Sequence, residues 1–281
     1  MTITQFLRAR RIPKSLAQRT VLGAALAGLC SSASALAIFT LNPAGVALNG
    51  SAFTGDNVLI SDYATVRFGA GNTFTENGFL SISGAQLGGS TLVPPGLNSN
   101  YGLYISFSGT GNTGAGDPTL VGTLGTFNTL TYTLYGYNGP ATFGFDVANN
   151  PTETAAGEIM LATGSLLSGT VSTAPAAGGG FTPSAAANLT FIPQASAAPF
   201  FVSPSPFYNV ALSSFTNTSS QVIPFAGGFN IRQGGGSFNF QPAQVPEPAT
   251  CALMLAGLFG VGVMKRRPKA TKTDLALDLG S

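Results

Sequence analysis

Apolar and polar residues alternate in short stretches through the middle of the chain, between about residues 38 and 240. Leu103, Ile105 and Phe107 occupy every second position. In a β-strand, residues two apart point to the same face, so this spacing gives each stretch one apolar face. The pattern therefore predicts strands rather than helices. The same alternation recurs at 130–134, 143–147, 229–231 and 238–240.

Turn-forming residues separate the alternating stretches. Asn77-Gly78, Asn138-Gly139-Pro140 and the run 234–236 of three glycines favour turns. The Ala-, Gly- and Pro-rich segment 174–187 is typical of a long loop. We expect an all-β fold, a jelly-roll-like two-sheet β-sandwich of about ten to twelve short strands. A β-helix or solenoid is the alternative, but no fixed short period supports it.

A different pattern follows residue 248. Residues 249–264 are uncharged and largely apolar, and Lys265, Arg266 and Arg267 follow directly. A helix of this length spans about 24 Å, close to the ~30 Å hydrocarbon core of a membrane. The abutting basic cluster is typical of a stop-transfer signal and disfavours a buried core helix. The pattern predicts one C-terminal transmembrane helix.

The N-terminus has the organisation of a secretory signal peptide. Basic residues up to Arg19 precede the apolar stretch 21–29, and small residues follow, with Ala35 and Ala37 as the expected signal peptidase site. By the positive-inside rule both basic ends stay in the cytoplasm and the intervening chain is exported. The predicted organisation is a signal peptide (1–37), an extracellular β-domain (38–240), a sorting segment (241–267) and a cytoplasmic tail (268–281).

The net charge of the exported part differs in sign from that of the whole chain, which is +2. Residues 38–245 contain two basic residues, Arg67 and Arg232, and seven acidic ones, a net charge of −5. A weakly acidic body argues against nucleic-acid binding. The two cysteines, Cys30 and Cys251, lie in the terminal signals, so the exported segment contains no disulfide of its own.

The residue types that most catalysis requires are missing. The chain has no histidine, and segment 38–245 has neither cysteine nor lysine, which excludes Ser-His-Asp and Cys-His nucleophiles and His- or Cys-bound metals. We expect no catalytic, cofactor or metal site. Glu153 and Glu158 could form the carboxylate pair of a glycosidase, but a polar stretch favours solvated loop charges. Calcium at Asp56, Asn57 and Asp62 is a further alternative to ordinary turn residues.

The tyrosines offer one possible ligand surface. Tyr135 and Tyr137 are two apart and so share one strand face, opposite Tyr132 and Leu134. Exposed aromatic rings can stack on sugars, whereas the ordinary interpretation is that tyrosines cover the core with their hydroxyls at its edge. Tyr135 and Tyr137 are our candidate sugar contacts.

The C-terminal order of elements resembles a known sorting signal. Pro246, Glu247 and Pro248, the apolar run and the basic cluster together resemble the PEP-CTERM signal of Gram-negative bacteria. The resemblance implies a membrane protease, exosortase, as partner, recognition or cleavage at Pro246-Glu247-Pro248, and transient anchoring in the inner membrane. The protein would then reside at the cell surface or in the extracellular matrix.

The body of the chain is similar to the flocculation-associated PEP-CTERM proteins. The similar segments are 78–82, 101–104, 131–140 and 224–236. This resemblance implies a non-enzymatic protein that promotes floc or biofilm formation with exopolysaccharide, and it supplies no catalytic residues. The expected partners are exosortase, signal peptidase and the Sec machinery, extracellular polysaccharide, and further copies of the chain. A carbohydrate-binding lectin is the alternative, and a carboxylate-only glycosidase comes third.

Overall fold

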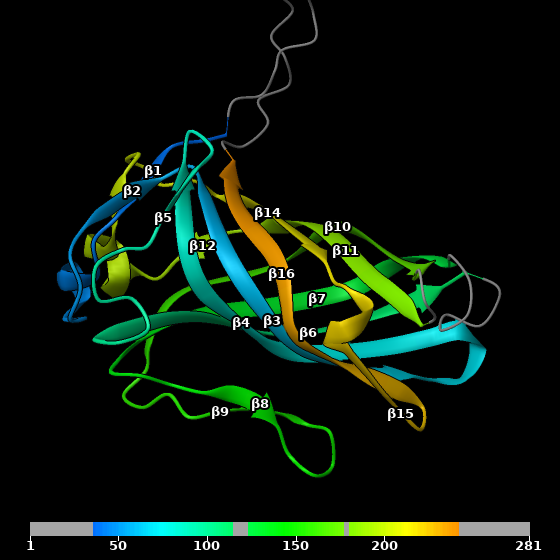
Figure 1. Ribbon diagram of the computed structural model, residues 1–281. Helices are drawn as coiled ribbons and strands as arrows, with labels where there is room; N and C mark the ends of the chain where they lie inside the picture. Colours follow the sequence, from blue (N-terminus) through cyan, green and yellow to red (C-terminus); the bar gives the residue numbers. More distant parts are fainter. Residues whose placement is uncertain (1–35, 115–122, 177–179, 242–281) are drawn as a thin grey trace, which may run out of the picture. The chain divides into compact units, whose positions relative to one another are not determined.

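Eight antiparallel strands of one sheet close on themselves into a barrel (Figure 1). The computed structural model describes residues 36–114, 123–176 and 180–241. Each strand pairs with the next in the chain, and the last pairs with the first. Because both edges are paired, the sheet exposes no open edge of its own. The strands are β3 (Asn57–Phe68), β4 (Thr73–Leu87), β6 (Tyr101–Thr113), β7 (Thr123–Asn138), β10 (Ile159–Pro175), β11 (Phe181–Thr190), β14 (Val210–Thr216) and β16 (Gly228–Gln241).

The prediction of a two-sheet sandwich of short strands is wrong. A single closed sheet forms instead, and its longest strand, β10, has 17 residues. Alternation specifies which side chains face inward, and both architectures use one inward face. Closure depends on the pairing of β16 with β3 and of β10 with β11, which no local pattern reveals. The inward positions themselves are confirmed: Leu103 and Ile105 are buried in the core.

Glycine-rich stretches predicted as turns or loops lie inside strands. Gly78 is in β4, residues 234–236 are in β16, and β10 and β11 run through most of 174–187. Several strand glycines pair across the ladder with an aromatic residue whose ring covers them, which replaces the packing that glycine lacks. The register pairs are Gly102–Tyr137, Gly111–Phe74, Gly164–Tyr132 and Gly236–Phe215.

One end of the barrel is filled by aromatic side chains. The Phe240 ring lies 5.0 Å from that of Phe39 and 4.9 Å from those of Phe191 and Phe207, mostly edge to face. Such geometry places the positive ring edge on the negative face of its neighbour. Further rings come from a small second sheet, which consists of β1 (Phe39–Leu41), β2 (Phe53–Gly55) and β13 (Phe201–Ser203), and from the 3₁₀ helix η3 (Ala195–Phe200). A second 3₁₀ helix, η1 (Pro43–Val46), contacts η3 but carries no aromatic residue.

A hairpin lies against the outside of β3 and β4 (Figure 1). It consists of β8 (Phe143–Phe145) and β9 (Pro151–Glu153), which pair with each other. The Phe143 ring contacts Tyr63, Phe79 and Tyr104, with ring centroids 5.6–6.1 Å apart. The remaining elements are β5 (Ser90–Leu92), β12 (Ile192–Pro193), β15 (Val222–Phe225), η2 (Ala70–Asn72) and η4 (Ser219–Gln221).

The predicted terminal signals lie outside the described residues. These are the signal peptide up to residue 35, the transmembrane helix at 249–264 and the tail from 268 onward. Within the described ranges, no helix has the length and apolar character needed to cross a membrane.

Candidate functional site

An uncharged hydroxyl and amide surface covers part of the barrel exterior. Asn77, Ser108, Thr131 and Ser165 lie in register across β4, β6, β7 and β10, and all four are exposed. Neighbouring strands are about 4.8 Å apart, so this row presents a regular series of donors and acceptors. A second exposed row lies beside it. We call the two rows the hydroxyl face; the second row consists of Thr75, Thr110 and Thr129.

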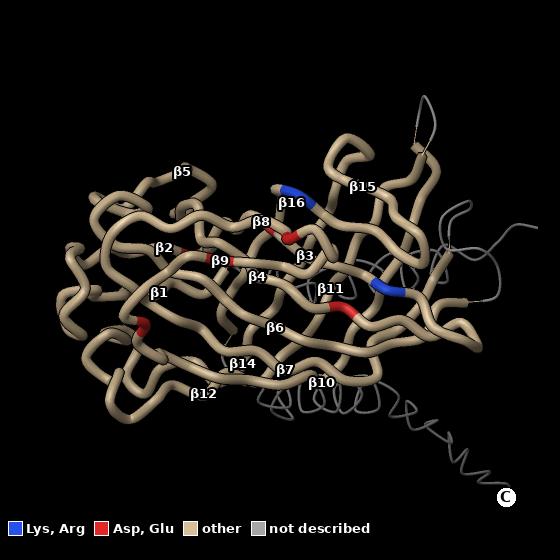
Figure 2. Tube along the Cα trace, turned by 90° about the horizontal axis from the view of Figure 1, so that it is seen from below, with Lys and Arg blue, Asp and Glu red and all other residues tan. Residues whose placement is uncertain are grey.

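Charge is sparse over the whole described body. Figure 2 shows the charged residues as isolated positions on an otherwise uncharged trace. Within the described ranges the cations are Arg67 and Arg232, and none of the acidic residues belongs to the hydroxyl face. The Thr110 and Thr129 hydroxyls lie 2.8 Å apart and bond each other. Such a face can exchange hydrogen bonds with another hydroxyl-rich polymer without strong charge repulsion.

The candidate sugar contacts differ in exposure. Tyr135 is half-buried and stacks on Tyr104 with ring centroids 5.3 Å apart. Tyr137 is 1% exposed and packs across Gly102. Both lie on the outward face of β7, as the spacing predicts, while Tyr132 is buried on the inward face. Tyr135 thus has the more accessible ring of the pair, and sugar contact stays a prediction.

Tyr104, which stacks on Tyr135, also forms a hydrogen bond with an acidic residue. Its hydroxyl donates a hydrogen bond to Glu158, and burial, followed by this bond, raises the pKa of the Tyr104 phenol. Glu153 accepts a hydrogen bond from the backbone amide of Ala155. The two glutamates of the candidate glycosidase pair are therefore engaged locally, one with a tyrosine and one with its own turn.

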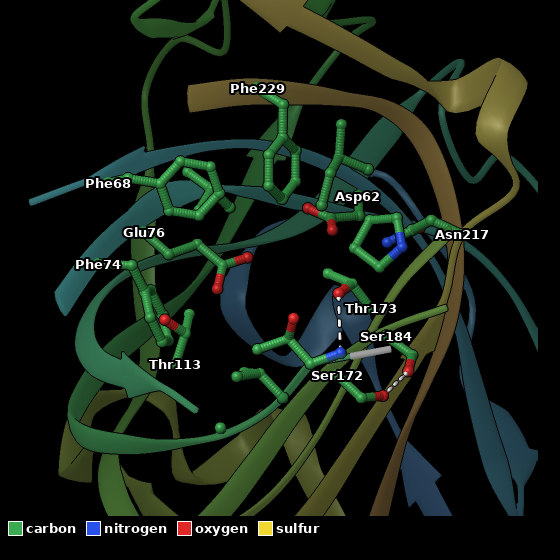
Figure 3. A pocket seen from close by; sticks show the side chains of 16 residues that line it. Asp62, Phe68, Phe74, Glu76, Thr113, Ser172, Thr173, Ser184, Asn217 and Phe229 are labelled. Atoms are coloured by element: carbon green, nitrogen blue, oxygen red, sulfur yellow. Dashed lines mark hydrogen bonds between the residues drawn. The ribbon is translucent and has the colours of Figure 1, made fainter. Parts of the chain in front are cut away.

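Two carboxylates that the sequence analysis did not identify as a pair point into the barrel. Asp62 on β3 and Glu76 on β4 are 2% and 9% exposed, and both line a cavity of about 60 Å³ (Figure 3). Burial raises the pKa of Glu76 to about 7. Burial and the nearby Glu76 charge raise the pKa of Asp62 well above its ordinary value. A charged residue at an inward position of an alternating stretch is the signal that could have identified them.

The alternative calcium site does not assemble. Asp56 accepts a hydrogen bond from the Gly88 amide at 2.6 Å, and the Asn57 side chain donates to Gln86 at 2.7 Å. Asp62 points into the barrel instead. In the part of the chain that the structure describes, no group of three or more acidic, histidine or cysteine side chains could hold a metal ion.

The sorting residues fall largely outside the structure. Pro246, Glu247 and Pro248, the stop-transfer cluster of Lys265, Arg266 and Arg267, and Ala35 lie outside the described residues, whereas Ala37 is described and half-buried. In a comparison with protein-family models, residues 244–267 match the PEP-CTERM protein-sorting motif. No curated protein and no solved structure matches the chain. The match confirms the predicted sorting motif.

Proposed function

We propose that this PEP-CTERM protein, which exosortase sorts to the cell surface, is a non-enzymatic matrix protein that promotes cell aggregation together with exopolysaccharide. The observation that carries the proposal is the sorting motif at 244–267, because it assigns the body to the extracellular side. The flocculation role rests on the resemblance of segments such as 131–140. We further propose a Gram-negative host and export through Sec and signal peptidase.

The hydroxyl face supports a role in adhesion. Its two rows offer hydroxyl and amide groups at strand spacing, and polysaccharides offer complementary hydroxyls along a repeating chain. The same face could bind a second copy of the protein, because uncharged surfaces repel each other weakly. Adhesion through many weak polar contacts requires no catalytic residue.

A lectin is the second candidate, and the half-buried ring of Tyr135 favours it. Its stacking on Tyr104 holds the ring in place, so little rotational freedom is lost when a sugar stacks on it. A glycosidase has the least support. Glu153 and Glu158 bond to neighbouring groups, and Asp62 and Glu76 lie inside the barrel, where a polymer has no access.

Lysine substitutions on the hydroxyl face test the adhesive role. In a strain that lacks the gene, complementation with the wild-type chain should restore floc sedimentation and co-sedimentation with host exopolysaccharide. The double variant Ser108→Lys, Thr131→Lys should reduce both, because charged side chains interrupt the row. Thr91→Lys, on exposed β5 away from the face, is the matched control.

If the double variant flocculates like the wild type at equal surface abundance, the hydroxyl face is not the adhesive surface. A Tyr135→Ala variant tests the second candidate function, sugar recognition by a lectin. If Tyr135→Ala loses binding on a glycan array while the Ser108→Lys, Thr131→Lys variant still binds, sugar recognition belongs to the stacked tyrosine rings and not to the hydroxyl face.

A further inference from the structure

The cavity around Asp62 and Glu76 lies inside the barrel, near a pair of small residues on β3 and β4. In the register of β3 with β4, Ala64 pairs with Gly78, and Asp62 and Glu76 flank this pair on the inward face. Alanine ends at its β-carbon and glycine has none, so no long side chain projects inward between Asp62 and Glu76 along these two strands. An eight-stranded barrel encloses just enough space for side chains or for one small ligand. Here the sequence leaves part of that space empty.

Neither carboxylate has a partner among the described residues. Asp62 Oδ1 is buried without a hydrogen-bond donor, and no described residue donates to Glu76. None of the described residues that line the cavity is a lysine or an arginine. Burial of a carboxylate without a donor or a cation is unfavourable, so such a group normally indicates a missing partner.

Asn217 gives an independent indication of the same missing partner. It is 3% exposed, lines the same cavity and follows β14, far from Asp62 in sequence. Its Oδ1 is also buried without a donor. Figure 3 shows the side chains of Asp62, Glu76 and Asn217 around one cavity. Three polar side chains from separate elements therefore face the cavity, and no described residue donates a hydrogen bond to Asp62 Oδ1, Asn217 Oδ1 or the Glu76 carboxylate.

The rest of the lining combines apolar residues with five hydroxyl residues, which are Thr113, Thr123, Ser172, Thr173 and Ser184. Phe68, Phe74 and Phe229 surround the carboxylates, and Val66 and Ile231 complete this side. Aromatic faces attract cations as well as hydrocarbon. A volume of about 60 Å³ holds about four to six water-sized groups. A second cavity of about 30 Å³ also has Asp62 and Glu76 in its lining, so the carboxylates border both spaces.

We propose that the barrel interior binds a small organic ammonium ion, with the protonated nitrogen between Asp62, Glu76 and Asn217 and a short hydrocarbon body against the phenylalanine rings. The ammonium donates to all three acceptors and neutralises one carboxylate charge. A calcium ion fits less well, because it requires six to eight oxygen ligands and much of this lining is aromatic or aliphatic. The inference is independent of the proposed adhesive function.

The first test uses n-butylammonium chloride and the isosteric, uncharged n-butanol. Titration calorimetry with the purified full-length chain at about pH 8 should detect the ammonium and not the alcohol. Glu76→Gln and Asp62→Asn should each weaken ammonium binding about tenfold or more, because a charge-assisted hydrogen bond is lost. Glu153→Gln, outside the barrel, is the matched control and should bind like the wild type.

Proton release provides a second readout that does not depend on the variants. Among the described residues, Asp62 and Glu76 are the titratable groups that face the cavity, and the lining residues of β6, β7, β10, β11 and β16 carry no charge. At about pH 5, where Glu76 is protonated, ammonium binding must displace a proton. Affinity should then fall, and the heat should depend on the ionisation enthalpy of the buffer.

Three results would overturn the proposal. Equal binding of n-butylammonium and n-butanol would show that the cavity recognises only the hydrocarbon chain and not the charge. Unchanged affinity in Glu76→Gln and Asp62→Asn would place the ammonium elsewhere. A thermal shift with calcium chloride and none with n-butylammonium, or no binding of either, would leave a metal or ordered water as the partner of these acceptors.

Discussion

At the residue scale, the barrel depends on glycines that leave room for rings. Gly164 pairs with Tyr132, and a β-carbon built at Gly164 would lie 2.0 Å from the Thr190 carbonyl oxygen and 2.3 Å from the Tyr132 ring. The Tyr132 hydroxyl in turn donates to the same carbonyl at 2.8 Å. One missing methyl group thus permits both the ring packing and the hydrogen bond.

Gly164→Ala should therefore destabilise the protein. The added methyl group must displace a ring and a backbone carbonyl, and overpacking of this kind costs about 1–3 kcal/mol. The free energy of unfolding from urea titration measures the loss.

Gly235→Ala is the matched control in the same sheet. The nearest atom to a β-carbon there is 3.8 Å away, so the change should be neutral or stabilising by up to about 1 kcal/mol. Equal effects of the two substitutions would contradict the role given to Gly164.

At the element scale, polar contacts attach the β8–β9 hairpin to the barrel. The Thr65 hydroxyl, fully buried on β3, lies 2.8 Å from the Asn149 carbonyl oxygen and 2.9 Å from Asn230 Oδ1. The Asn230 amide donates to Asn149 Oδ1 at 2.9 Å, and the Arg67 guanidinium donates to the Ala148 carbonyl at 2.9 Å. The hairpin tip is thus bound through its backbone as well as through Phe143.

Thr65→Val should loosen this hairpin. The isosteric change leaves the buried Asn230 Oδ1 without a donor, which costs about 1–3 kcal/mol. Hydrogen exchange followed by mass spectrometry should show faster exchange in peptides that cover 143–153. Thr75→Val, an exposed threonine on the hydroxyl face, should leave both stability and exchange unchanged. Unaltered exchange in Thr65→Val would mean that Phe143 alone holds the hairpin.

The sequence did not predict this element's position. Asn138-Gly139-Pro140 favours a turn, but it does not indicate which strand the following segment joins, and β8 pairs with β9. The contacts that place the hairpin, such as Thr65 with Asn149, join residues 84 positions apart. Local turn chemistry gives no information on partners at that separation.

At the scale of the whole molecule, the buried carboxylates make stability depend on pH. The pKa of Glu76 is raised from 4.5 to about 7, so the folded state binds its proton more tightly than the unfolded state. Stability is then fully present below about pH 4.5 and falls as pH rises to 7, by about 3 kcal/mol for this group alone. Asp62 acts in the same direction.

The free energy of unfolding should accordingly be larger at pH 5 than at pH 8. Asp146 does not interfere, because hydrogen bonds from Asn150 lower its pKa and it stays ionised throughout this range. Glu76→Gln removes one of the two titrating groups and should weaken the dependence, while the contribution of Asp62 remains. A chain that is more stable at pH 8 than at pH 5 would contradict the burial of these acids.

The sorting signal and the inward side chains could be predicted from the sequence, whereas the closure of the barrel and its buried carboxylate pair could not. The sorting signal was predictable because export and membrane insertion depend on linear order, here Pro246-Glu247-Pro248, an apolar run and basic residues, and the family model confirms it. The inward positions of Leu103 and Ile105 were predictable from period two. Closure of the barrel and the meeting of Asp62 with Glu76 were not, because both depend on strand register between distant segments.

Mass spectrometry of the protein from the cell surface and medium tests the central claim most directly. The account predicts a chain whose C-terminus lies at or near Pro246-Glu247-Pro248, without residues 249–281, and the loss of this processed form in a strain without exosortase. A chain that keeps residues 249–281 and remains in the cytosol, unaffected by removal of exosortase, would contradict it.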